Sequence, residues 1–129
     1  MEPKSILIAD DERHILNVLS IKLRNAGFSV IAAEDGAEAY SLAQSARPEV
    51  IIADYQMPLL SGVEVCSKLW ADPQTRHIPV VLLTARGFSL SEGDRALGNI
   101  KRVIDKPFSP REVLACIHGL LAEVAVRGH

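Results

Sequence analysis

Five polar residues stand just after apolar segments of the chain, and their types could carry out chemistry together. Asp10 and Asp11 follow the first such segment, Asp54 another, Thr84 another, and Lys106 comes at the end of the last. If these segments are neighbouring parallel strands, their carboxyl ends meet at one edge of a sheet, where such sheets bind ligands. We therefore expect three carboxylates, a hydroxyl and an ammonium to converge on one crevice.

This combination of groups indicates a metal-assisted phosphoryl site. Three carboxylates close together repel one another, and a hard divalent cation relieves that repulsion. Ligands that are all oxygen favour Mg²⁺, or Mn²⁺ in its place, over Zn²⁺. Three negative charges and Lys106 leave a charge of about −2, which one divalent ion neutralises, so that a phosphate can enter. A carboxylate can then act as the nucleophile and form an aspartyl phosphate, with Thr84 and Lys106 as donors to the phosphate oxygens.

Apolar segments alternate along the chain with patterns typical of helices. The predicted strands are Ser5–Ala9, Phe28–Ala33, Val50–Ala53, Val80–Leu83 and Arg102–Ile104. The predicted helices are Glu12–Ala26, Ala37–Ala46, Val63–Ala71, Ser91–Leu97 and Pro110–Val126. Unbroken Ile, Val, Leu and Ala runs are typical of strands covered on both faces of a parallel sheet. The chain is therefore predicted to be α/β, with a flavodoxin-like, doubly wound, five-stranded parallel sheet of order 2-1-3-4-5 and five helices.

Local signals predict where several helices begin and end. Gly27 is expected to end the first helix and Pro73 the third. The segment Ser109–Glu112 is a capping box with proline at the first helical position. The fourth helix has the weakest pattern, because Gly87, Gly93 and Gly98 flank or interrupt it.

Size and composition restrict the class of protein. With 129 residues, 48% hydrophobic and 23% charged, the chain is expected to form a single domain over residues 1–129, without an output domain. The net charge of −2 argues against direct nucleic-acid binding. Basic residues gather in 86–111, which most simply forms a solvated surface. No run is long and apolar enough for membrane insertion, and Cys66 and Cys116 have no metal or redox spacing, so a cytoplasmic protein is expected.

Four segments together resemble the receiver domain of two-component response regulators, and stand-alone chemotaxis-type receivers in particular. The resemblance covers essentially the whole chain. The segments that carry it are Ile6–Glu12, Ile51–Pro58 with Ser61-Gly62, Val81–Ala85 and Asp105–Phe108.

The resemblance implies a role for each site residue. Asp54 is the expected phosphoacceptor, while Thr84 and Lys106 hold the phosphoryl group. Asp10, Asp11, Asp54 and the Gln56 carbonyl are the expected Mg²⁺ ligands. The Lys106–Pro107 peptide is expected to be cis, and Gln56 and Arg86 occupy positions that tune phosphoryl lifetime in the family.

The resemblance also implies partners. The donor is expected to be a sensor histidine kinase, a histidine phosphotransfer protein or a small acyl phosphate, and an unknown downstream protein receives the signal. The chain is expected to be a monomer or a weak homodimer. One position departs from the family pattern. Val103 stands where most relatives have an aromatic residue, whose side-chain rotamer changes together with that of the threonine.

Other interpretations of the same residues remain open at this point. Asp10 and Asp11 could cap a helix, and Asp54 could begin a turn. A degenerate receiver could act as a phosphorylation-independent interaction module. An aspartate-nucleophile phosphatase is disfavoured, because such enzymes carry an acid two residues after the nucleophile, where this chain has Gln56. The expected protein is therefore not an enzyme, apart from its own phosphorylation and dephosphorylation.

Overall fold

Strands and helices alternate throughout the part of the chain that the structure describes. This computed structural model describes residues 3–85 and 88–127, with side chains as far as residue 123. The strands are β1 (Ser5–Ala9), β2 (Ser29–Ala33), β3 (Val50–Asp54), β4 (Val80–Thr84) and β5 (Ile100–Asp105). The helices are α1 (Arg13–Asn25), α2 (Gly36–Ala46), α3 (Gly62–Ala71), α4 (Glu92–Arg95) and α5 (Pro110–Arg127).

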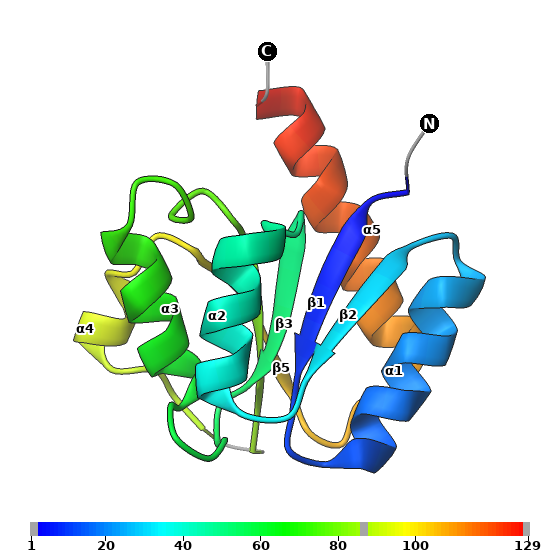
Figure 1. Ribbon diagram of the computed structural model, residues 1–129, viewed down its shortest axis with the longest axis horizontal. Coiled ribbons are helices and arrows are strands. Elements are labelled where there is room, and N and C mark those ends of the chain that lie inside the picture. Colours follow the sequence, from blue (N-terminus) through cyan, green and yellow to red (C-terminus); the bar gives the residue numbers. More distant parts are fainter. Residues whose placement is uncertain (1–2, 86–87, 128–129) are drawn as a thin grey trace.

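The strands form one parallel sheet in the order β2-β1-β3-β4-β5, which confirms the predicted flavodoxin-like arrangement. Helices α1 and α5 cover one face of the sheet, and α2 and α3 cover the other (Figure 1). Every residue of β3 and β4 is buried, whereas β2 and β5 at the two edges are partly exposed. The carboxyl ends of the strands therefore meet along one rim, at the end of the sheet opposite the chain termini (Figure 1).

Alternation along each strand divides the core into two layers. In β1, Ile6 and Ile8 pack toward α1 and α5, whereas Leu7 and Ala9 pack toward α2 and α3. Successive side chains of a strand point to opposite faces, so an unbroken apolar run supplies both layers at once. The layer under α2 and α3 contains five alanines, and these small side chains allow close packing of the helices on the sheet; they are Ala9, Ala33, Ala39, Ala43 and Ala53.

The predicted helix ends are confirmed by the backbone. Gly27 has a φ of 99°, in the left-handed region that glycine adopts without strain, and α1 ends just before it. Helix α3 ends at Ala71, two residues before Pro73. At the start of α5, the Ser109 hydroxyl accepts the Glu112 N–H, and the Glu112 carboxylate accepts the Ser109 N–H. The Lys106–Pro107 peptide is cis, as expected from the family resemblance.

Helix α4 is shorter than predicted and β5 is longer. A capping box of Ser91 and Asp94 begins α4, but the helix ends at Arg95 instead of Leu97. The segment after α4 packs closely against α3, where a Cβ atom on Gly98 would lie 2.3 Å from the Trp70 ring. The chain thus turns sharply against Trp70 and enters β5 at Ile100, before the predicted Arg102.

Gly36 holds the loop that follows β3 against the start of α2. Its N–H donates to the Pro58 carbonyl at 3.1 Å, and a Cβ atom there would lie 1.9 Å from the Leu60 carbonyl oxygen. We expect Gly36→Ala to lower the free energy of unfolding by about 1–3 kcal/mol, measured by urea denaturation, because backbone must move to admit the methyl group. Gly119→Ala on α5 is the matched control, since nothing lies within 4 Å of its Cβ position. Equal stability of the two variants would contradict this packing argument.

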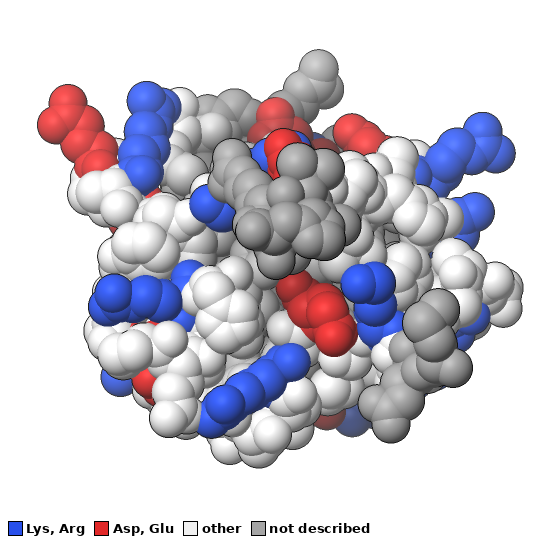
Figure 2. Space-filling model, turned by 90° about the horizontal axis from the view of Figure 1, so that it is seen from above, with Lys and Arg blue, Asp and Glu red and all other residues white. Residues whose placement is uncertain are grey.

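The end of the molecule where the strands begin carries acidic and basic side chains side by side, without a region of one sign (Figure 2). No helix among the described residues is long and apolar enough to cross a membrane.

Candidate functional site

Three carboxylates meet at the rim, as the sequence predicted. Asp54 is the last residue of β3, and Asp10 and Asp11 follow β1, its neighbour in the sheet. One carboxylate oxygen of each residue lies within 4.8 Å of the other two. Asp10 is fully buried and Asp54 nearly so, whereas Asp11 is exposed. The carboxylates thus form a compact acidic cluster that opens to solvent on the Asp11 side.

Lys106 supplies the positive charge of the site. It follows β5, and its Nζ lies 3.2 Å from Asp54 Oδ2 and 3.6 Å from both Asp10 Oδ2 and Glu12 Oε1. Its backbone N–H donates to the Thr84 carbonyl at 2.7 Å, which fixes the loop beside the end of β4. Burial opposes the charge on Lys106, but the carboxylates of Asp10 and Asp54 outweigh it and raise the pKa of the ammonium. Lys106 therefore stays protonated beside the cluster.

The cluster holds more negative charge than Lys106 balances. Burial raises the pKa of Asp10 to about 6; the Glu12 N–H opposes this shift and the Asp54 carboxylate adds to it. Burial also raises the pKa of Asp54, and Lys106 offsets only part of the effect. Asp10 Oδ1 accepts the Glu12 N–H at 2.9 Å, but Asp10 Oδ2 is buried without a hydrogen-bond partner among the described residues. An oxygen-only cluster with an unpartnered buried oxygen fits a hard divalent cation.

A cavity beside Asp54 opens the cluster to solvent. Gln56 lines it next to Asp11, and the Gln56 N–H favours the ionised form of Asp54. The Tyr55 and Phe88 rings also line it and lie against each other, with centroids 4.3 Å apart. The described residues around the cavity are Asp11, Glu12, Asp54, Tyr55, Gln56, Ala85, Phe88 and Lys106. The sequence pattern assigns no chemical role to Glu12, Tyr55 or Phe88.

Thr84 lies at the rim, but its hydroxyl is engaged elsewhere. It is the last residue of β4 and is fully buried. Its Oγ1 donates to Asp105 Oδ1 at 3.1 Å, and Thr84 is not among the described residues that line the cavity. The structure thus brings Asp10, Asp11, Asp54 and Lys106 together, and leaves the fifth predicted group turned toward β5.

Comparison with known proteins decides the family. The family described as the response regulator receiver domain matches residues 6–118. This chain belongs to that family. Receiver domains are signalling domains that serve phosphorylation-dependent two-component systems, and they bind Mg²⁺ at an acidic pocket such as the one formed here. A phosphorylation-independent interaction module is therefore not favoured.

Individual relatives agree with this assignment. The receiver domain is 39% identical to the alkaline phosphatase synthesis transcriptional regulatory protein PhoP of Bacillus subtilis over 121 residues, which are 92% of this chain and 48% of PhoP. It therefore spans about half the length of that relative. It is 32% identical to the polar-differentiation response regulator DivK of Brucella anthropi, covering 94% of this chain and 98% of DivK. The structure of the chemotaxis response regulator CheY4 of Vibrio cholerae superposes with a TM-score of 0.82 at 32% identity, covering 90% and 97% of the two chains.

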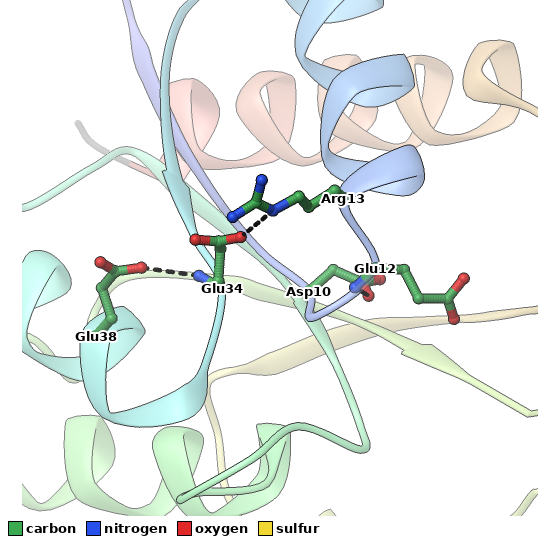
Figure 3. Close-up of polar contacts among 5 residues, drawn as sticks. All are labelled: Asp10, Glu12, Arg13, Glu34 and Glu38. Atoms are coloured by element: carbon green, nitrogen blue, oxygen red, sulfur yellow. Dashed lines mark hydrogen bonds and ion pairs between the residues drawn. The ribbon is translucent and has the colours of Figure 1, made fainter.

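A polar network connects the start of α1 in this receiver domain to the loop between β2 and α2. Arg13 Nε donates to Glu34 Oε1 at 2.8 Å, and the Glu34 N–H donates to Glu38 on α2 at 2.8 Å (Figure 3). Asp10 and Glu12 lie in the loop that leads into Arg13 at the start of α1 (Figure 3). The Arg13–Glu34 pair is exposed and therefore adds little stability. Arg86, the other position expected to tune phosphoryl lifetime, lies outside the described residues.

The raised pKa of Asp10 predicts how stability depends on pH when divalent metal is removed by a chelator. Between its ordinary pKa of 3.8 and its folded pKa of about 6, Asp10 holds a proton in the folded state that it has lost in the unfolded state. The contribution of Asp10 is therefore greatest at low pH and is lost as pH rises through 6. We expect Asp10→Asn to have a higher free energy of unfolding than the wild type near pH 7.5. This difference should be smaller by about 1 kcal/mol near pH 5.

Urea denaturation at the two pH values measures this difference. Glu92→Gln, which changes an exposed carboxylate far from the cluster, should follow the wild type at both. An Asp10→Asn advantage that does not change with pH would contradict the prediction.

Proposed function

We propose that this receiver domain accepts a phosphoryl group on Asp54 and passes the signal on through a change in conformation. One observation carries the proposal: Asp54 Oδ2 lies 3.2 Å from Lys106 Nζ, inside an acidic cluster in which one buried oxygen has no hydrogen-bond partner among the described residues. The Asp54 carboxylate borders an open cavity and is the nucleophile. Asp10 and Asp11 lie beside it as metal ligands.

In the forward step, an Asp54 oxygen attacks phosphorus and forms the P–O bond of an acyl phosphate. The P–N bond of a phosphohistidine donor breaks, and the electron pair leaves with the imidazole, which takes up a proton. With acetyl phosphate, a P–O bond breaks and acetate leaves. Dephosphorylation is a separate reaction: water attacks the same phosphorus, the P–O bond to Asp54 breaks, and its electron pair restores the carboxylate. Inorganic phosphate leaves with the protons of the water. Lys106 donates to a phosphoryl oxygen in both reactions and stabilises the charge on the transferred group.

The chain's own oxygens fit a magnesium site. Asp10, Asp11, Asp54 and the Gln56 carbonyl would hold Mg²⁺, or Mn²⁺ in its place. When bound, the ion supplies positive charge to the phosphoryl oxygens. Asp10 is held by the Glu12 N–H and keeps its second oxygen free toward the cluster. Asp54 serves as both ligand and nucleophile, so metal binding and phosphoryl uptake are coupled.

Receiver domains interact with histidine kinases and downstream targets. For this chain we propose a phosphohistidine on a sensor kinase or histidine phosphotransfer protein as the donor and a protein as the target. We also propose that residues 1–129 act as one receiver domain, as a monomer or a weak homodimer. A cytoplasmic location agrees with the two free thiols, Cys66 and Cys116.

Incubation with acetyl phosphate and Mg²⁺, followed by intact-mass measurement and peptide mapping, tests this function. We expect one phosphoryl group per chain, on Asp54, that hydroxylamine removes and that does not form in the presence of a chelator. The same protein should not turn over para-nitrophenyl phosphate, since Gln56 cannot serve as the general acid of a phosphatase. An unmodified protein at saturating donor, or a phosphoryl group on another residue, would overturn the proposal.

A further inference from the structure

The Thr84 hydroxyl is bound to a carboxylate that belongs to no part of the proposed phosphoryl site. Thr84 ends β4 and Asp105 ends β5, and the two residues are direct partners in the register of these parallel strands. Thr84 Oγ1 donates to Asp105 Oδ1 at 3.1 Å. Thr84 is fully buried, whereas Asp105 is exposed on the edge strand. The hydroxyl is therefore directed toward the sheet edge.

A threonine hydroxyl has a single hydrogen to donate. While that hydrogen is bound to Asp105, it is not available to a phosphoryl oxygen on Asp54. Lys106, the next residue along the chain, already lies 3.2 Å from Asp54 Oδ2 and lines the cavity. Of the two expected donors to the phosphoryl group, one is thus in place before phosphorylation and the other is held aside.

We propose that Asp105 is a positioning residue, which holds the Thr84 hydroxyl away from Asp54 until a phosphoryl group competes for it. The inference rests on the proposed phosphorylation of Asp54. A phosphoryl group there is an anionic acceptor, as is Asp105, so Thr84 exchanges one charge-assisted hydrogen bond for another. Because the two bonds are similar in kind, the strength of the Asp105 acceptor sets how readily Thr84 turns toward the site.

The hydrogen bond also links phosphorylation to the exposed edge of the sheet. When Thr84 turns to the phosphoryl group, the Asp105 carboxylate loses its donor at the end of β5. Val103, in the same strand, is 42% exposed and offers no polar group to follow the movement of Thr84. Asp105 is the residue of β5 that contacts the Thr84 hydroxyl, so the change at Thr84 reaches the edge strand through it.

Beryllofluoride, a phosphoryl mimic, provides the test, with binding measured by NMR titration in Mg²⁺. Asp105→Val removes the acceptor, and we expect it to raise affinity for the mimic by about tenfold, because Thr84 no longer has to leave an anionic partner. Asp105→Asn removes the negative charge as completely as Asp105→Val does but keeps a neutral oxygen acceptor. Its gain in affinity for beryllofluoride should therefore be smaller, about threefold. In a Thr84→Val background, Asp105→Val should change affinity little.

Each result of this experiment decides a separate question. Wild type that does not bind beryllofluoride, or binding that survives Asp54→Asn, would overturn the proposed function itself. Wild-type binding with no gain in either Asp105 variant would overturn the role of Asp105 alone. Equal gains in Asp105→Asn and Asp105→Val, or a gain that persists in Thr84→Val, would assign the effect to charge beside Lys106 and overturn the positioning role. Asp105→Asn preserves shape, so it keeps the test valid if Asp105→Val does not fold.

Discussion

Asp54→Asn is expected to abolish phosphoryl uptake from acetyl phosphate. The amide oxygen is uncharged and does not form the acyl phosphate, so the rate should fall by at least about 10³-fold, the order found when an enzyme loses its nucleophile. Intact-mass measurement over time gives the rate directly. The variant should remain folded and gain stability near neutral pH, because burial already disfavours the Asp54 charge.

Asp11→Asn is the matched comparison for Asp54→Asn. It also removes one carboxylate from the cluster, but it leaves the nucleophile and its contact with Lys106 in place. Its defect should lie in metal binding, so a higher Mg²⁺ concentration should restore most of the rate. The same increase should have no effect on Asp54→Asn. Uptake by Asp54→Asn at the wild-type rate, or rescue of both variants by Mg²⁺, would contradict the assignment of Asp54 as nucleophile.

Lys106→Met is expected to separate metal binding from phosphoryl transfer. The substitution keeps a long side chain but removes the ammonium that lies 3.2 Å from Asp54 and 3.6 Å from Asp10. Without that donor, the transferred group loses stabilisation in the transition state, and the rate of phosphorylation should fall by about 10²–10³-fold. Mg²⁺ should bind at least as tightly as in the wild type, because a neighbouring positive charge has been removed.

The Lys106 prediction is specific because the rate of phosphorylation should fall while the affinity for Mg²⁺ does not. Calorimetric titration measures Mg²⁺ affinity, and the acetyl phosphate reaction at saturating Mg²⁺ measures the rate. Lys101→Met is the control, since it makes the same substitution at an exposed position of β5, the strand that Lys106 follows. It should change neither quantity. If Lys106→Met lost metal affinity and rate in parallel, Lys106 would be supporting the structure of the cluster instead of contacting the phosphoryl group.

Much of the fold could be predicted because local sequence patterns determine most of its strands and helix ends. Runs such as Ile6–Ala9 and Val80–Leu83 are apolar at every position, and that pattern is typical of strands between two helical layers. The strand order followed from alternation of strands and helices, since right-handed crossovers leave few arrangements. The acidic cluster followed in turn, because Asp10, Asp11 and Asp54 come after neighbouring strands. Helix ends at Gly27 and Ser109 were set by local backbone chemistry.

Other features depend on contacts between residues far apart in the chain. Gly98, after α4, lies against Trp70, a residue of α3 that no local pattern connects with it. The pKa of Asp10 rises because the folded chain buries it beside Asp54. The Thr84–Asp105 hydrogen bond requires the register of β4 against β5, which a sequence of apolar residues does not specify to the single position.

Residue types and the alternation of strands and helices are local properties, so they predict which chemical groups lie at the rim of the sheet. The directions of those groups follow from the folded chain: Lys106 points toward Asp54, and Thr84 toward Asp105. The second oxygen of Asp10 is buried without a hydrogen-bond partner among the described residues. Side-chain direction and burial depend on strand register and on the layers packed around the rim. These are set by the whole fold and not by neighbours in the chain.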